Sequence, residues 1–346
     1  MGLNQKEKLM YNQNSGYGQA LLNAVAQQVP TFGRIFIVMD PDDTSMQHYD
    51  MMKELFPQDP QGNVRLFTDL AAAYAAAESN NNDVILLDAN STHVLTAVLT
   101  ITKNRVHFMG MDGGERLVQQ GAKVQLGGAI DAAYVVKDNG VRNSFRNIKF
   151  IMASTHANAK SVLQLGSEGG LYKNISAVFG VVNNLGATDT FEVINGADSG
   201  TFINCTFGAD TLLTSAARAV MSIDQVNGFE FKSNIFKSCN FIISSSSSTA
   251  AFIRLSAVGD ILFSNLFDRC NFVASVDSAG GAALAEAVQT GTGTVKGTLN
   301  FVSPGTFAVT NFTTATSGRN AAVYVIGPVL TPEAKTDLVA QIPVAT

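Results

Sequence analysis

The feature of this sequence that most constrains its fold is a pattern that returns about every 30 residues. Five segments share it: SFRNIKF at 144–150, LYKNISA at 171–177, TFINCTF at 201–207, IFKSCNF at 235–241 and LFDRCNF at 266–272. Their aromatic second positions are separated by 27, 30, 34 and 31 residues. A second series, VLQL at 162–165, FEVI at 191–194, VMSI at 220–223 and FIRL at 252–255, advances by 29, 29 and 32 residues. Two series with nearly the same step indicate coils that stack on one another.

The residues between these segments decide between a helical and a β architecture. Helical repeats of this length need apolar residues at a period of 3.6, and from residue 84 almost to the C-terminus that period is nearly absent. Short apolar runs separated by Gly, Asn, Asp and Ser predict short strands and turns instead. We therefore expect an all-β parallel solenoid of about 30 residues per coil. Its roughly eight coils, each ~4.8 Å above the last, would form a rod on the order of 40 Å long.

Two columns of side chains are expected to point into the solenoid. The first contains Ile148, Ile175, Cys205, Cys239 and Cys270, and the second, two residues later on the same strand face, contains Phe150, Ala177, Phe207, Phe241 and Phe272. All three cysteines of the chain fall in the first column, and none has CxxC spacing. We therefore interpret them as small buried apolar residues rather than as disulfide or metal-binding residues.

A ladder of asparagines precedes the first inner column. Asn147, Asn174 and Asn204 occupy the position where a solenoid must bend between two strands. Asparagine tolerates the left-handed backbone conformation that such a bend needs, and its amide can bond to the coil above or below. Ser238 and Arg269 replace asparagine in the later coils, so a different bend is expected there.

Glu192 is the anomaly of the second series, because it stands where the other segments have an inward apolar residue. A lone inward carboxylate is costly unless it is paired. A local register slip or a strand-end position is the expected explanation. The alternative is a paired carboxylate that marks a site.

The chain divides into three segments. Residues 1–65 are expected to form an N-terminal arm and anchoring segment, residues 66–330 the β-helix, and residues 331–346 a C-terminal capping helix or tail. A helix is predicted over residues 68–78 at the start of the solenoid, with Thr68 as its N-cap. The four apolar residues at 84–87 that follow predict a strand buried on both faces.

Charge and hydropathy exclude some classes of partner. The chain has 23 basic and 28 acidic residues, a net charge of −5 and no run of Lys or Arg, so a nucleic-acid partner is not expected. No stretch approaches ~20 uninterrupted apolar residues, so no membrane span is expected. The first residues have no hydrophobic signal core. Charged residues make up only 15% of the chain, against roughly 25% on average, which indicates a surface rich in small neutral residues.

The segment at 66–114, LFTDLAAAYAAAESNNNDVILLDANSTHVLTAVLTITKNRVHFMGMDGG, combines a helix, a first strand, a turn and two further strands. With the coil pattern it resembles the right-handed parallel β-helix of the pectate-lyase-like superfamily, in which a helix caps the first coil and asparagines line one bend. The preceding GRIFIVMD strand and acidic turn make the arrangement similar to that of β-helical virion structural proteins of tailed bacteriophages. The resemblance implies the fold over about residues 33–330.

No catalytic constellation is recognised in the sequence. The motifs that the resemblance would imply for polysaccharide hydrolases and lyases do not occur in the coils, and the acidic residues Asp198, Asp224, Asp260 and Asp268 are scattered rather than stacked. The four histidines do not cluster; only His107 and His156 are near the coils. The sequence therefore predicts no catalytic, cofactor-binding or metal-binding residue, no cofactor, and no enzymatic activity.

These observations lead to one expected function and one alternative. The expected function is that of a bacteriophage virion structural protein, a capsid decoration or auxiliary head subunit that assembles as a homotrimer. It would bind other virion proteins such as the major capsid protein, and would be located in the virion after assembly in the host cytoplasm. The alternative is a tail-associated β-helix protein that binds or degrades a glycan. The absence of Trp and the presence of only seven Tyr favour the first, since sugar rings often stack on these side chains.

Overall fold

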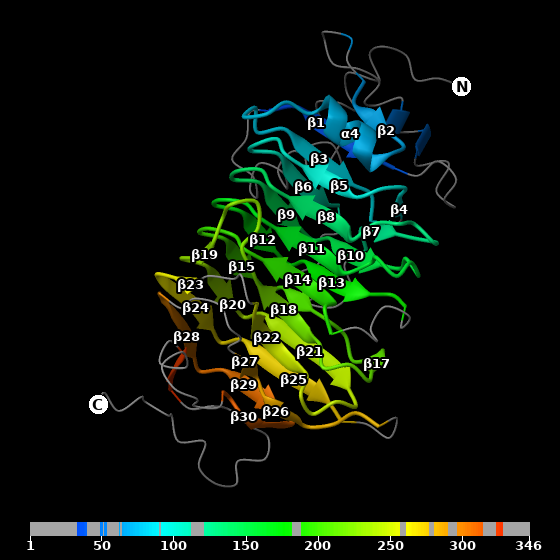
Figure 1. Cartoon of the computed structure of the whole chain (residues 1–346). Coiled ribbons are helices and arrows are strands. Elements are labelled where there is room, and N and C mark those ends of the chain that lie inside the picture. Colours follow the sequence, from blue (N-terminus) through cyan, green and yellow to red (C-terminus); the bar gives the residue numbers. More distant parts are fainter. Residues whose placement is uncertain are drawn as a thin grey trace.

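The chain winds into a rod of stacked coils in the computed structural model of Figure 1. The structure describes residues 33–39, 49–50, 52–53, 62, 64–89, 91–111, 121–181, 188–256, 261–276, 280–289, 296–313 and 323–327. The sequence progresses from one end of the rod to the other, with about 31 residues per turn. The predicted arm up to residue 32 and the predicted helix at 331–346 lie outside the described residues.

Three parallel sheets form the sides of the rod. Sheet 1 runs in the order β2 (Leu66–Phe67), β1 (Ile35–Val38), β3 (Val84–Leu87), β6 (His107–Gly110), β9 (Ser144–Arg146), β12 (Leu171–Lys173), β15 (Thr201–Ile203), β20 (Ile235–Lys237), β24 (Ser264–Asp268), β28 (Thr298–Val302) and β31 (Val323–Ile326). Because one coil contributes one strand, neighbours in the sheet are about one repeat apart in the sequence. The all-β parallel solenoid expected from the repeat is confirmed.

Sheet 2 contains β4 (Thr92–Leu95), β7 (Lys123–Leu126), β10 (Lys149–Met152), β13 (Ser176–Phe179), β16 (Thr206–Phe207), β21 (Asn240–Ser245), β25 (Asn271–Ser275) and β29 (Gly305–Phe307), with β17 (Leu213–Thr214) beside β21. Sheet 3 contains β5 (Leu99–Ile101), β8 (Tyr134–Asp138), β11 (Ser161–Leu165), β14 (Phe191–Asn195), β18 (Ala219–Ile223), β22 (Ala251–Leu255) and β27 (Val288–Gln289). Two smaller pairs are β19 (Phe231–Lys232) with β23 (Ile261–Leu262), and β26 (Leu284–Glu286) with β30 (Val309–Asn311).

A column of aromatic rings runs through the centre of the rod. Its members come from successive strands of sheet 1: Phe108, Phe145, Tyr172, Phe202, Phe236, Phe267 and Phe301. Successive ring centroids are 4.9, 5.4, 4.7, 4.3, 4.5 and 4.6 Å apart, close to the spacing between strands. Stacked rings therefore connect each coil to the next.

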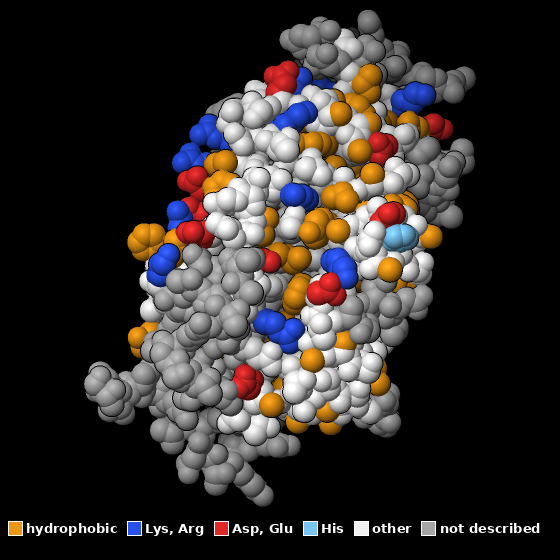
Figure 2. Space-filling view, viewed as in Figure 1, with side chains coloured by type: hydrophobic (Ala, Val, Ile, Leu, Met, Phe, Trp, Pro, Cys, Tyr) orange, Lys and Arg blue, Asp and Glu red, His pale blue; other side chains and the backbone are white. Residues whose placement is uncertain are grey.

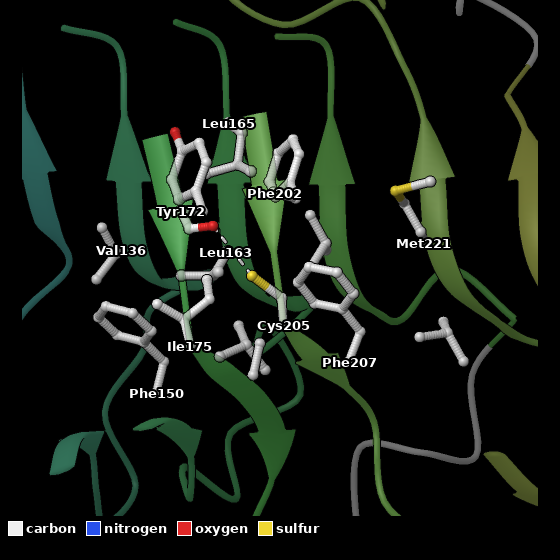
Figure 3. Close-up of a cluster of buried hydrophobic side chains, with 14 of the residues drawn as sticks. Val136, Phe150, Leu163, Leu165, Tyr172, Ile175, Phe202, Cys205, Phe207 and Met221 are labelled. Atoms are coloured by element: carbon white, nitrogen blue, oxygen red, sulfur yellow. Dashed lines mark hydrogen bonds between the residues drawn. The ribbon is translucent and has the colours of Figure 1, made fainter. Parts of the chain in front are cut away.

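The two inner columns identified in the sequence lie beside these rings. Ile148, Ile175, Cys205, Cys239 and Cys270 are buried, as are Phe150, Ala177, Phe207, Phe241 and Phe272. The thiols are unpaired, and the Sγ of Cys205 donates to the carbonyl oxygen of Tyr172 at 3.3 Å (Figure 3). Burial raises the pKa of the Cys239 and Cys270 thiols, so both stay protonated.

The asparagine position adopts the left-handed conformation in every coil from Asn147 onward. Asn147, Asn174 and Asn204 have φ values of 55°, 53° and 53°, and the Nδ2 of Asn174 donates to the Oδ1 of Asn147 at 2.9 Å. The different bend expected in later coils is absent, because Ser238 and Arg269 have φ values of 53° and 51°. The coil geometry therefore imposes this conformation on residues that do not favour it.

The first coil differs from the sequence prediction in detail. The helix α4 spans Leu70–Ala76, shorter than the predicted 68–78, and its N-cap is Asp69 rather than Thr68. The Asp69 carboxylate accepts from the amides of Ala71 and Ala72 at 3.3 and 2.9 Å. A carboxylate satisfies two free amides at once, which explains why Asp69 takes the cap position.

Strand β3 is buried on both faces, as its four apolar residues indicate. Ile85 and Leu87 point into the main core. On the other face, Val84 and Leu86 join a second cluster with Ile37, Met39, Met52, Leu66 and Met109. Strand β1, from the segment interpreted as an arm, is paired with β3 in register and thus forms part of sheet 1.

Candidate functional site

The outer face of sheet 1 carries a histidine and a serine on neighbouring strands. His107 is the first residue of β6, Ser144 is the first residue of β9, and the two are paired in register. The next residues, Phe108 and Phe145, point into the core, so His107 and Ser144 point outward. The Nδ1 of His107 lies 2.8 Å from the Oγ of Ser144. His107 is half-buried, and Ser144 is 4% exposed.

The surroundings of His107 keep its ring neutral. Burial and the Arg146 guanidinium lower its pKa to about 4, against an opposing effect of Asp83. The Nε2 lies 3.5 Å from the Oδ1 of Asn82. A neutral ring with its proton on Nε2 faces Asn82 as a donor and leaves Nδ1 free to accept the proton of the Ser144 hydroxyl.

Arg146 lies on the same strand and the same face as Ser144, two residues further along β9. Its Nε is buried and has no hydrogen-bond partner among the residues that the structure describes. Burial lowers the pKa of the guanidinium from its usual value, but arginine stays charged at neutral pH. A cation with a spare donor therefore lies beside the histidine and the serine.

Asp83 anchors the turn that carries Asn82. It is fully buried and accepts from the Nη2 of Arg34 at 2.9 Å, from the backbone amide of Arg34 at 2.8 Å and from the amide of Glu78 at 2.7 Å. Burial alone would raise the pKa of Asp83, but these donors lower it below its usual value. The charged Asp83 thus ties β1, α4 and β3 together next to His107.

Glu192 also has a partner that the sequence did not reveal. The expected register slip is present, because β14 pairs Val193, and not Glu192, with Leu163 of β11 and Met221 of β18. The Oε2 of Glu192 lies 2.5 Å from the Nη2 of Arg218, and both side chains are at most 4% exposed. Burial raises the pKa of Glu192, and the Arg218 guanidinium opposes that shift. The pair lies inside the rod, so we assign it to the packing of the coils.

A second buried polar cluster surrounds Asp138. Its carboxylate accepts from the hydroxyl of Tyr172 at 2.7 Å and from the Nδ2 of Asn143 at 2.9 Å. The Tyr172 hydroxyl also lies 3.3 Å from the Oγ of Ser167. Burial raises the pKa of Asp138 to about 6. Asp138 has no exposed surface, which excludes contact with a ligand in the folded state.

The sequence indicates that His107 is near the coils but does not connect it with Ser144, which lies 37 residues further along the chain. The aromatic column of the structure reveals the connection. Because Phe108 and Phe145 stack, the residues just before them must also be neighbours. The columns of side chains predicted from the repeat all point into the rod, whereas His107 and Ser144 lie on its outer face.

In the described part of the chain, no cluster of three or more His, Cys, Asp or Glu side chains could hold a metal ion. No helix in that part is both long and apolar enough to cross a bilayer. On the coloured part of the face formed by sheet 3, charged side chains are scattered among neutral ones (Figure 2).

Known proteins resemble this chain in structure rather than in sequence. No family profile and no curated protein sequence matches. A pectin methylesterase from Aspergillus niger matches with a TM-score of 0.52 and 13% identity, over 88% of this chain and 87% of its own. Pectin methylesterases from Erwinia chrysanthemi and Yersinia enterocolitica have TM-scores of 0.44 and 0.41 and identities of 12% and 11%. They cover 89% and 79% of this chain and 92% of their own.

This comparison corrects one expectation and establishes another. The expectation that the chain has no enzymatic activity is contradicted, because the Aspergillus niger protein of similar fold is an enzyme. That protein is not described as a virion component, so the comparison gives no support for a phage capsid. The parallel coils and the similarity over most of both chains agree with the fold that the sequence predicted. The chain therefore has the right-handed parallel β-helix fold of the pectin methylesterases.

Proposed function

We propose that this chain is a polysaccharide-acting β-helix protein that hydrolyses an ester carried by a glycan. The contact between the Oγ of Ser144 and the Nδ1 of His107, at 2.8 Å on the outer face of sheet 1, carries the proposal. A nucleophile within hydrogen-bond reach of a neutral base is the arrangement required for acyl transfer. The name of the Aspergillus niger pectin methylesterase supports this choice, since it describes an esterase acting on a polysaccharide with a similar fold.

The proposed reaction assigns one role to each of three residues. The Oγ of Ser144 adds to the ester carbonyl carbon while its proton passes to the Nδ1 of His107. The ester C–O bond then breaks, and the departing alkoxide takes that proton, which leaves an acyl group on Ser144. Water loses a proton to the same nitrogen, adds to the acyl carbon and releases the acid as the proton returns to Ser144. Each of the two steps, acylation of Ser144 and hydrolysis of the acyl group, passes through a tetrahedral intermediate with a negatively charged oxygen. The Arg146 guanidinium stabilises that oxygen in both steps.

The direct test is ester hydrolysis by the purified chain and its variants. p-Nitrophenyl acetate reports acyl transfer, and methyl-esterified and acetylated polysaccharides report the glycan substrate. We expect Ser144→Ala and His107→Ala each to lower kcat/KM by about 100-fold or more. Ser222→Ala is the matched control, because Ser222 is a buried, outward-facing serine on sheet 3 without a histidine neighbour. Hydrolysis that survives in the Ser144→Ala variant would refute the role of Ser144.

The pH dependence of the same activity tests the role of His107. Since its pKa is lowered to about 4, the ring is a neutral base above that pH and loses its acceptor below it. We expect kcat/KM to be constant near neutrality and to fall as the pH decreases through about 4. A loss of activity already below pH 6.5, the ordinary value for histidine, would contradict the environment described for this ring.

We further propose that the protein is a tail-associated virion component that assembles with itself as a homotrimer. Support comes from a mainly aliphatic column on the outer face of sheet 2, which contains Val94, Ile151, Val178, Ile242, Val273 and Phe307 and is interrupted by Gln125 between Val94 and Ile151. Apolar outer columns favour contact with another protein surface. Light scattering should give about three times the 36.6 kDa mass of the chain, and a monomer at micromolar concentration would contradict the proposal. Mass spectrometry of purified particles tests the virion location.

A further inference from the structure

The outer face of sheet 2 carries a polar column next to the aliphatic one. Its members are Thr92, Lys123, Lys149, Ser176, Thr206, Asn240 and Asn271. Toward the end of the column the side chains bond to one another: the Nδ2 of Asn271 donates to the Oδ1 of Asn240 at 2.9 Å. The Nδ2 of Asn240 in turn lies 3.5 Å from the Oγ1 of Thr206. Hydrogen bonds between neighbours thus satisfy this part of the column.

Lys123 and Lys149 depart from that arrangement. Strands β7 and β10 place them directly opposite each other, one rung apart, which is about 4.8 Å. The next residues in the column are Thr92 and Ser176, which carry no charge. Like charges at directly opposite positions of a sheet destabilise it. Burial and the nearby Lys123 both lower the pKa of Lys149. The effect of Lys123 is the one expected from repulsion between the two ammonium groups.

Three lysines elsewhere in the described residues have partners. Lys160 and Lys232 pair with Asp189 and Asp198 at 2.7 and 2.6 Å. The Nζ of Lys103 donates to three carbonyl oxygens of the segment that ends α4, at 2.7 to 2.9 Å. No such ion pair or hydrogen bond is found for Lys123 or Lys149 within the described residues. These two adjacent cations therefore differ from Lys160 and Lys232, each of which lies beside a carboxylate.

We propose that Lys123 and Lys149 form a binding site for an oxyanion, a carboxylate, sulfate or phosphate group that lies between the two ammonium groups. Such a group removes the repulsion and accepts a charge-assisted hydrogen bond from each lysine. The group is either a free inorganic anion or a substituent of an acidic polysaccharide. The site is on sheet 2, whereas Ser144 and His107 are on sheet 1, so it does not depend on the proposed esterase function.

Titration calorimetry at low ionic strength tests the site with three probes: inorganic sulfate, inorganic phosphate and polygalacturonate. We expect Lys123→Gln and Lys149→Gln each to weaken binding by roughly tenfold. Lys137→Gln is the matched control, because Lys137 points outward from sheet 3 between the neutral residues Thr100 and Gln164, and its removal should leave the affinity unchanged. Binding of the inorganic anions identifies the group alone as sufficient, and binding of the polymer alone identifies a polymer-borne group. Failure of all three probes to bind, or equal weakening by Lys137→Gln, overturns the proposal.

A second measurement does not require an affinity. The pKa of Lys149, followed by nuclear magnetic resonance of its side chain, should rise in the Lys123→Gln variant because the repulsion is removed. In the wild type it should rise on addition of the anion that binds. A Lys149 pKa that is unaffected by saturating sulfate, phosphate and polygalacturonate would show that no anion reaches this place. These variants leave Ser144 and His107 intact, so esterase activity is measured independently.

Discussion

At the residue scale, the buried polar groups of this rod are explained by the partners that neighbouring coils supply. Tyr172 stands in a column of phenylalanines, and Asp138 stands opposite Leu165 in a column that is otherwise mostly aliphatic. The Tyr172 hydroxyl donates a hydrogen bond of 2.7 Å to the Asp138 carboxylate. Each would be costly alone, because a buried polar group without a partner loses its hydration and gains nothing in return.

Asp138 predicts a specific dependence of stability on pH. Its pKa is about 6 in the folded chain and 3.8 as an ordinary group, so between these values the folded state binds more protons than the unfolded state. Stability from this residue is therefore present below about pH 4 and is lost as the pH rises through 6. The loss is up to about 3 kcal/mol. Urea unfolding of the wild type and of Asp138→Asn at pH 4, 5 and 6 measures it.

The comparison with Asp138→Asn removes the contribution of all other titrating groups. The difference in unfolding free energy between the two proteins should shift in favour of the variant as the pH rises from 4 to 6. A constant difference would mean that Asp138 stays charged throughout this range. Tyr172→Phe adds a further check, because loss of the hydroxyl donor should raise the pKa of Asp138 further and strengthen the dependence.

The Glu192–Arg218 pair predicts a large effect of one substitution. Arg218→Met leaves the Glu192 carboxylate buried without its partner, which should lower the free energy of unfolding by roughly 3–5 kcal/mol. Lys160→Met removes one member of an exposed pair and should lower it by less than about 1 kcal/mol. Chemical denaturation measures both. Equal effects of the two substitutions would contradict the burial of the Glu192 pair.

At the element scale, the helix α4 shows which local detail the sequence leaves open. Thr68 and Asp69 are both good N-cap residues, and their order in the sequence does not decide between them. The carboxylate of Asp69 accepts two amide bonds, whereas the sequence alone suggested one from the Thr68 hydroxyl. The helix therefore begins at Leu70.

This difference is directly testable with two neighbouring substitutions. Asp69→Ala should destabilise the first coil by about 1 kcal/mol, because it removes the partner of the first free amides. Thr68→Ala should change stability by less than about 0.5 kcal/mol. Thermal unfolding together with hydrogen exchange of the α4 amides distinguishes the two. A larger effect of Thr68→Ala would restore Thr68 as the cap.

The bends between sheets 1 and 2 illustrate a second limit of sequence-based prediction. Asparagine at 147, 174 and 204 identified the bend because that residue type tolerates positive φ. The residue types at Ser238 and Arg269 do not predict a positive φ, yet the stacked coils impose this conformation on them. Backbone hydrogen bonds between neighbouring coils fix the path of the backbone at these bends. The conformational preference of the residue type therefore predicts only some of the positions with positive φ.

At the scale of the whole molecule, the fold was predictable because stacking makes the sequence periodic. Residues that point inward must match the coil above and below, which leaves a repeat of apolar and aromatic residues in the sequence. The outer faces carry no such requirement. His107 and Ser144 therefore left no repeated pattern, and their contact became visible only when the register of β6 and β9 was known.

The continuity of the core predicts that one buried charge affects the entire rod. Cys239 lies in the inner column with no exposed surface, so Cys239→Asp should destabilise the fold by several kcal/mol. Asn240→Asp introduces the same carboxylate one residue further along, on the partly exposed outer face, and should be tolerated. Circular dichroism and thermal unfolding of the two variants measure the contrast. Similar melting temperatures would exclude the inward placement of Cys239.

Because each sheet is parallel and each coil supplies one strand, the backbone hydrogen bonds between strands run along the length of the rod. A tensile force applied along that length opens one junction between coils at a time. A force across the rod is shared by the strands of many coils at once. The molecule is thus mechanically anisotropic, with its weaker direction along its own axis.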